Sequence, residues 1–192
     1  DVYLMFPSLY QHGPDTLDIR LAVSRDGIRW SRPDRETAFI PLGVGDAFDS
    51  GSLYMGQGMI RVEDELWLYY SGSPLRHQEA ELENLTKPGN ARVYSRVVAR
   101  LDRFVAATAE ACGGSFSSPP LRFTGNTLKL NVRVRSGGRV RVGLLDEEGR
   151  PLSKYSVSDC EPIVGDSLSK TVQWKTGSDV RGRAAKPTRL RV

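Results

Sequence analysis

The chain has 192 residues, of which 39% are hydrophobic and 26% charged, and its formal net charge is +4. This composition is that of a folded globular protein with one or two domains. No apolar run approaches the roughly 18 residues that a membrane-spanning helix needs, so we expect no membrane partner.

The first hundred residues predict short strands joined by turns. Runs rich in aromatic and β-branched residues alternate with Gly, Pro, Asp and Ser, which is typical of an all-β protein. Residues 24–30 predict a tight hairpin, because Asp26-Gly27 supplies a positive-φ turn and Trp30 can then pin the hairpin in the core. The expected strands cover residues 2–9, 18–24, 52–62, 65–71 and 92–101.

The spacing of these strands indicates propeller blades. Phe48-Asp49-Ser50-Gly51 and the apolar run at residues 65–72 fall at the spacing of one four-stranded blade of roughly 40 to 50 residues. A hundred residues make about two blades, whereas closed propellers have four to eight. Since open sheet edges invite association, we expect the chain to be a fragment whose missing propeller blades belong to the same chain.

A long connection follows the strand at residues 65–71. Residues 74–90 include His77 and the glycosylation sequon Asn84-Leu85-Thr86, which matters only in a secreting eukaryote. Loops of this length often bind ligands.

From residue 103 onward the pattern predicts a second domain. Expected strands at residues 121–124, 127–135, 139–145, 152–157 and 170–175 alternate in the manner of a two-sheet antiparallel sandwich. We place the domain boundary near residues 101–105.

A basic stretch lies in this second part. Four arginines alternate with valines around a Ser136-Gly137-Gly138 turn, which predicts a hairpin with the arginines in solvent. The alternative is a binding surface for sulfated or uronate polysaccharide, or for nucleic acid. Because no aromatic residues lie between the arginines to stack on bases, we expect no nucleic-acid partner. The arginines are Arg133, Arg135, Arg139 and Arg141.

Two cysteines and three aspartates complete the second part. Neither Cys112 nor Cys160 has a second Cys or a His at metal-ligand spacing, so we expect buried thiols, with a bridge between them left open. For Asp159, Asp166 and Asp179 we favour Asx turns over a structural calcium site.

Both parts resemble known carbohydrate-active proteins. Residues 21–33, with Phe39-Ile40 and residues 65–70, resemble the five-bladed β-propeller glycosidases of the invertase, levansucrase and arabinanase type. Residues 121–126, 130–132, 158–167, 172–180 and 186–191 resemble the C-terminal sandwich of uncharacterised bacterial glycosidase-like proteins. The resemblance implies an all-β protein with two domains. Residues 1–102 would be the last blades of a five-bladed propeller, and residues 103–192 an antiparallel β-sandwich accessory domain. It also implies a secreted or extracytoplasmic location.

The resemblance implies a function without assigning an active site. Such enzymes act on glycosidic bonds through paired carboxylates. No segment matches the Asn-Asp-Pro-type nucleophile motif or the Glu-Cys-type acid motif of the invertase group, so no catalytic residue is carried over. The leading hypothesis is that this chain is part of a glycoside hydrolase-like protein that acts on oligo- or polysaccharides. Most of its catalytic carboxylates would then lie upstream of this chain. The alternative is a non-catalytic carbohydrate-binding or scaffold protein.

Candidate site residues follow from their own chemistry. Asp49 stands at the entry to a strand, from which a catalytic carboxylate can point into a propeller's central funnel, although a turn aspartate that accepts backbone N–H groups is the interpretation its position favours. Trp67 and Tyr70 could stack on sugars, although aromatic residues in apolar strands more often form core. With two histidines in irregular positions we expect no metal and no cofactor. The sugar-binding candidates are His12, Asp15, Tyr54 and His77.

Overall fold

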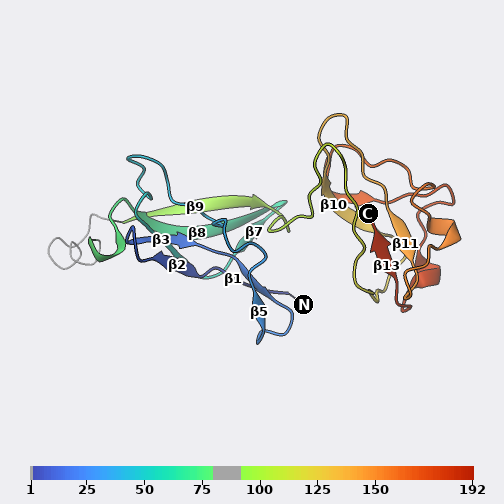
Figure 1. Cartoon of the computed structure of the whole chain (residues 1–192), viewed down its shortest axis with the longest axis horizontal. Coiled ribbons are helices and arrows are strands. Elements are labelled where there is room, and N and C mark those ends of the chain that lie inside the picture. The colour runs from blue at the N-terminus through green and yellow to red at the C-terminus, as the bar shows by residue number, and fades with distance from the viewer. Residues whose placement is uncertain (1, 80–91) are drawn as a thin grey trace. The chain divides into compact units, whose positions relative to one another are not determined.

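The computed structural model describes residues 2–79 and 92–192 (Figure 1). These residues are mostly β-strand and loop with very little helix, which confirms the all-β prediction. The strands form open sheets, and no closed barrel or ring occurs among the described residues. The sequon at Asn84 and most of the long connection after residue 74 lie outside the described residues.

The chain consists of two compact units, Asp1–Val105 and Ala106–Val192. The division therefore falls at the edge of the region, residues 101–105, in which the sequence places a domain boundary. Each unit has its own hydrophobic core, one around Ile19 and Leu53 and the other around Trp174.

The first unit contains two sheets. The larger has the strand order β2-β3-β6-β8-β7, with β9 paired to β8, and the smaller has the order β1-β4-β5. The strands of the larger sheet are β2 (Ser8–Gln11), β3 (Thr16–Ile19), β6 (Ser52–Met55), β7 (Ile60–Val62), β8 (Glu65–Ser73) and β9 (Val93–Arg100). Those of the smaller sheet are β1 (Tyr3–Met5), β4 (Ala22–Ser24) and β5 (Trp30–Ser31).

β8 is the centre of the larger sheet. It runs antiparallel beside β9 from Glu65 to Gly72, as Figure 1 shows, and its other edge is shared by β6 and β7. The single strand predicted over residues 52–62 is thus interrupted at residues 56–59. Gly58 has a φ of +79°, and the Gly56 N–H still donates to the Tyr69 carbonyl at 2.8 Å. The interruption is a local irregularity along one paired edge.

The core of the first unit lies on one face of β8. Leu66, Leu68 and Tyr70 are buried, whereas Tyr69 between them is 44% exposed. This alternation follows from the two-residue period of a strand. Tyr70 of this face belongs to a core cluster with Ile19, Ile40 and Leu53.

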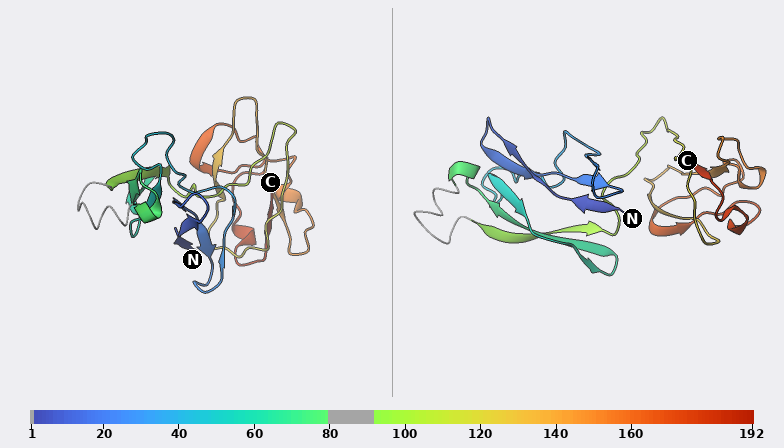
Figure 2. Two further views of the ribbon diagram at one scale, coloured as in Figure 1. Left: turned by 60° about the vertical axis from the view of Figure 1, so that its left-hand side comes forward. Right: turned by 90° about the horizontal axis from the view of Figure 1, so that it is seen from below.

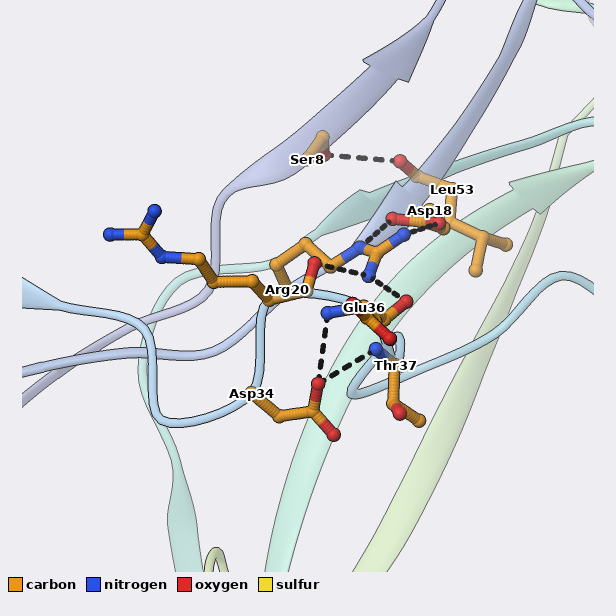
Figure 3. Close-up of polar contacts among 8 residues, drawn as sticks. Ser8, Asp18, Arg20, Asp34, Glu36, Thr37 and Leu53 are labelled. Atoms are coloured by element: carbon orange, nitrogen blue, oxygen red, sulfur yellow. Dashed lines mark hydrogen bonds and ion pairs between the residues drawn. The ribbon is translucent and has the colours of Figure 1, made fainter.

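A buried ion pair joins β3 to the loop that follows β5 (Figure 3). The Arg20 guanidinium bonds both oxygens of Asp18, Nε to Oδ1 at 2.6 Å and Nη2 to Oδ2 at 2.7 Å. Its Nη1 donates to the carbonyls of Glu36 at 2.7 Å and Arg35 at 3.3 Å. Asp34 caps the same loop by accepting from the backbone N–H groups of Glu36 and Thr37. One fork-shaped cation therefore fixes both a strand and a loop.

The predicted hairpin around Asp26 is present, but Trp30 has a different role from the one expected. β4 pairs with β5, and Gly27 in the connecting loop has a φ of +74°. The Asp26 Oδ1 atom accepts from the backbone N–H groups of Ile28 at 2.9 Å and Arg29 at 2.7 Å. Trp30 is 39% exposed, and its Nε1–H donates to the Gly27 carbonyl at 3.2 Å. The indole thus holds the turn and does not enter the core.

The second unit is built from short strands and long loops, as Figure 2 shows. β10 (Lys129–Arg133) pairs with β12 (Asp166–Thr171), and β11 (Gly143–Leu145) pairs with β13 (Arg189–Arg191). Two 3-10 helices, η1 (Ser153–Tyr155) and η2 (Arg181–Arg183), lie between strands. The strand predicted over residues 152–157 is therefore wrong.

The predicted hairpin around Gly137 is wrong in its pairing. The turn exists, with Gly137 at a φ of +80° and Gly138 N–H donating to the Arg135 carbonyl at 3.0 Å. The flanking segments, however, bond residues 163–165: Val134 N–H donates to Gly165, and Val140 exchanges bonds with Ile163. Arg133, Arg135 and Arg139 are exposed, as predicted, whereas Arg141 is partly buried and donates to the carbonyls of Ser158 and Cys160.

Trp174 lies at the centre of the second core. It is 1% exposed, its Nε1–H donates to the Val142 carbonyl at 2.9 Å, and the Tyr155 ring packs edge-on against it at 5.2 Å. The core also contains the buried residues Leu144, Cys160, Ile163, Val172 and Val180.

The cysteines and aspartates of this unit differ in part from expectation. Cys160 is buried, but Cys112 is exposed, so the prediction of a buried thiol is wrong there; both are free. The Asp159 carboxylate bonds Lys175 and Ser156, and that of Asp179 accepts from the Arg181 backbone N–H, an Asx turn. Asp166 begins β12.

Candidate functional site

The four sugar-binding candidates meet at one end of the larger sheet of the first unit. His12 and Asp15 lie in the turn between β2 and β3, Tyr54 lies in β6, and His77 follows β8. Tyr10, the third residue of β2, lies among them. We call Tyr10, His12, Asp15, Tyr54 and His77 the turn cluster.

Asp15 ties the β2–β3 turn to the chain that follows β8. Its backbone is left-handed, with a φ of 57°, a conformation in which aspartate is one of the few tolerated residues. The Tyr10 hydroxyl donates to Oδ1 at 2.7 Å, and the Gln78 backbone N–H donates to Oδ2 at 3.2 Å. The Asp15 carbonyl in turn accepts from the His77 backbone N–H at 2.9 Å. Asp15, which the sequence predicts to bind a sugar, therefore also organises the site.

These contacts lower the pKa of Asp15 below its ordinary value of 3.8, and the bond from Tyr10 has the largest effect. The bond from Gln78 and the charges of His77 and Arg76 act in the same direction. A carboxylate whose pKa is depressed in the folded state stabilises the fold above its ordinary pKa, and that stabilisation is lost as the pH falls through the lowered value.

We expect Tyr10→Phe to raise the pKa of Asp15 toward 3.8, because the strongest bond to the ionised form is removed. The free energy of unfolding should then rise less between the lowered pKa of Asp15 and pH 3.8 than it does in the unaltered protein. Carboxyl chemical shifts followed by NMR titration measure the pKa directly. Tyr3→Phe, which alters an exposed tyrosine of β1, is the control. An unchanged Asp15 titration in Tyr10→Phe would contradict this account.

Tyr54, His77 and Arg92 form the other half of the site. The Tyr54 hydroxyl and the His77 Nδ1 atom lie 2.7 Å apart, and the tautomer of the histidine decides which of them donates. The Arg92 guanidinium lies over the Tyr54 ring, 4.4 Å from its centroid, in a cation–π contact. Arg92 directly precedes β9, so the two chain ends of the long connection after β8 both contribute to the site.

Rings are packed edge to face at the centre of the cluster. The Tyr10 ring lies 4.5 Å from the His12 ring and 5.1 Å from the His77 ring, both in T-shaped geometry. His12 is exposed, while Tyr10, Tyr54 and His77 are partly buried. The His12 imidazole is therefore exposed to solvent and packs against the partly buried Tyr10 ring.

Asp49, the predicted catalytic residue, belongs to a separate network. Its Oδ2 atom accepts from the Tyr70 hydroxyl at 2.7 Å, and no backbone N–H among the described residues donates to its carboxylate. Burial raises the pKa of Tyr70, and the bond to Asp49 raises it further. A Cβ at Gly72 would lie 2.5 Å from the Asp49 Cβ, so glycine is required for this close approach. The Asp49 carboxylate, in the turn before β6, is therefore held by a tyrosine hydroxyl.

Two residues of the site were not among the candidates. Tyr10 lies in an apolar strand run that looks like core, and only its spacing before His12 and Asp15 could have drawn attention to it. Nothing in the sequence distinguishes Arg92 from the other arginines. Across residues 2–79 and 92–192, no three His, Cys, Asp or Glu side chains gather in a group that could hold a metal ion.

Comparisons with known proteins add no relative. No family model, no curated protein and no solved structure matches the chain. In the part of the chain that the structure describes, no helix is long and apolar enough to cross a membrane.

Proposed function

We propose that this chain is part of a glycoside hydrolase-like protein and that the turn cluster contacts its oligo- or polysaccharide. The proposal rests on one observation: His12, Asp15, Tyr54 and His77, chosen from three separate sequence segments for their sugar-binding chemistry, converge at one end of one sheet. Ligand sites typically combine aromatic walls with a few fixed polar groups, and the cluster has both.

We also propose the finer architecture that the sequence predicts. The first unit represents the last blades of a five-bladed β-propeller, and further blades of the same protein complete the ring. In support, the face of the β7–β8–β9 sheet away from the core exposes large side chains that a neighbouring blade could cover. They are Ile60 (53%), Tyr69 (44%), Tyr94 (85%) and Val98 (44%). The second unit represents an accessory β-sandwich, in support of which two small antiparallel sheets share one core.

For hydrolysis we propose Asp49 as one of the two carboxylates that a glycosidase needs. Its fixed position beside Tyr70 and the required glycine at position 72 support a role that depends on precise placement. The second carboxylate would come from the proposed further blades, because the carboxylate of Asp15 is already bonded by Tyr10 and Gln78.

A non-catalytic carbohydrate-binding protein is the second candidate function. It is favoured by the separation of the two carboxylates into different hydrogen-bond networks, one around Tyr10 and the other around Tyr70. The two carboxylates of a glycosidase flank one scissile bond, one acting at the glycosidic oxygen and the other as the nucleophile or the base for water. Asp15 and Asp49 instead bond separate tyrosines.

A glycan panel tests both candidates on the full 192-residue chain. We expect at least one oligosaccharide to bind, and His12→Ala to weaken that binding roughly tenfold, because a contact of about 1.4 kcal/mol is lost. Tyr3→Ala, an exposed ring of β1, is the matched control. If no glycan binds, the proposal fails.

Product analysis then separates the two functions. Hydrolysis that disappears in Asp49→Asn, with binding retained, supports the enzyme. Binding without any turnover supports the non-catalytic alternative.

A further inference from the structure

Arg92 has an unused hydrogen-bond donor beside the turn cluster. Its Nη1 atom is buried, and among the described residues no atom accepts a hydrogen bond from it. An unmade bond of a buried charged group costs more than that of a neutral group, so such donors normally have a partner. The Tyr54 ring covers one face of the guanidinium, which directs the remaining interactions to its N–H edges.

Two described carboxylates in or near the turn cluster have partners other than Arg92. Asp15 accepts from Tyr10 and Gln78, and Glu79 accepts from the Arg76 backbone N–H. None of the ion pairs among the described residues includes Arg92. The guanidinium therefore stands next to a candidate sugar site with its charge uncompensated by a described carboxylate.

We infer that the glycan bound at the turn cluster carries an acidic group, a carboxylate or a sulfate, and that Arg92 binds this group. The inference rests on the proposed function and specifies its substrate class. A planar guanidinium with two parallel N–H groups matches the oxygens of either anion, and such charge-assisted bonds are about twice as strong as neutral ones. The stacking on Tyr54 and the hydrogen bond between Tyr54 and His77 hold the cation in place before the ligand arrives.

The test compares acidic glycans with their neutral counterparts. Polygalacturonate is paired with its carboxyl-reduced form, and dextran sulfate with dextran, so that the two pairs distinguish a carboxylate from a sulfate. We expect one acidic member to bind at least tenfold more tightly than its neutral partner. The measurement is made at two salt concentrations, because salt screens general charge attraction more than it weakens a fixed contact.

Two matched variants assign the preference to one residue. Arg92→Gln should abolish the preference for the acidic member, whereas Arg100→Gln removes the same charge from the far end of β9 and should preserve it. Arg92→Lys, which keeps the charge but loses the fork, should restore only part of the preference. Thermal unfolding of each variant shows that the fold is intact.

The outcomes separate this inference from the function on which it rests. Neutral glycans that bind as tightly as acidic ones, or an acidic preference that survives Arg92→Gln, would overturn the inference and leave the proposed function standing. If none of the four glycans nor any member of the glycan panel binds, both are overturned.

Discussion

Arg20→Met is expected to lower the free energy of unfolding of the first unit by about 3–5 kcal/mol. The substitution leaves the Asp18 carboxylate, whose side chain is 13% exposed, without the cation that bonds both of its oxygens. The carbonyls of Arg35 and Glu36 lose their donor at the same time, so the loop after β5 should loosen. Urea denaturation measures the free energy, and hydrogen exchange of β3 and β8 locates the loss.

Two further variants show that the effect comes from the unpaired charge. Arg35→Met removes an exposed arginine from the same loop and should change the stability by less than about 0.5 kcal/mol. Asp18→Leu combined with Arg20→Met removes both charges and should recover much of the loss, since an apolar pair of similar volume often replaces a buried ion pair without penalty. Equal stability of Arg20→Met and the unmodified protein would show that the ion pair does not hold the loop.

Trp174→Ala is expected to cost the second unit about 3–5 kcal/mol. The indole is 1% exposed and fills the centre of its core, so its removal leaves a cavity. The change also deprives the buried Val142 carbonyl of its donor and Tyr155 of its ring partner. Trp174→Phe keeps most of the volume and should cost less.

Hydrogen exchange can assign this loss to one unit. Because the two units have separate cores, amides of β11 should exchange faster in Trp174→Ala while those of β8 keep their protection. Phe116→Ala, which truncates a 46% exposed ring of the same unit, should have a much smaller effect. Loss of protection in β8 to the same extent would mean that the units unfold together.

The strand regions of the first unit could be predicted because they depend on local pattern, but the predicted strands 2–9 and 18–24 each contain two strands of different sheets. The apolar and aromatic run at residues 65–71 predicts a strand, and Asp26-Gly27 marks a turn. The pairing of strands in the second unit depends on distant segments. The turn at Gly137 looks the same in sequence whether its flanks bond each other or residues 163–165. Only the packing of the core around Trp174 decides between them.

The site shows the same limit. His12, Asp15 and His77 could be identified as candidates because polar, ligand-binding residue types stand out in turns and loops. Their convergence depends on the pairing of β2 with β3 and of β6 with β8, which no single residue reveals. Arg92 became visible only through its contact with Tyr54 and its unused donor.

The two thiols of the second unit differ in exposure, so that one of them can carry a reporter group. Cys112 is open to solvent, whereas Cys160 is 1% exposed and burial raises the pKa of its thiol, so little reactive thiolate forms there. A maleimide dye should therefore couple once per molecule of the unaltered chain. A second coupling would signal the opening of the core that encloses Cys160, which turns a simple labelling reaction into a kinetic assay for unfolding.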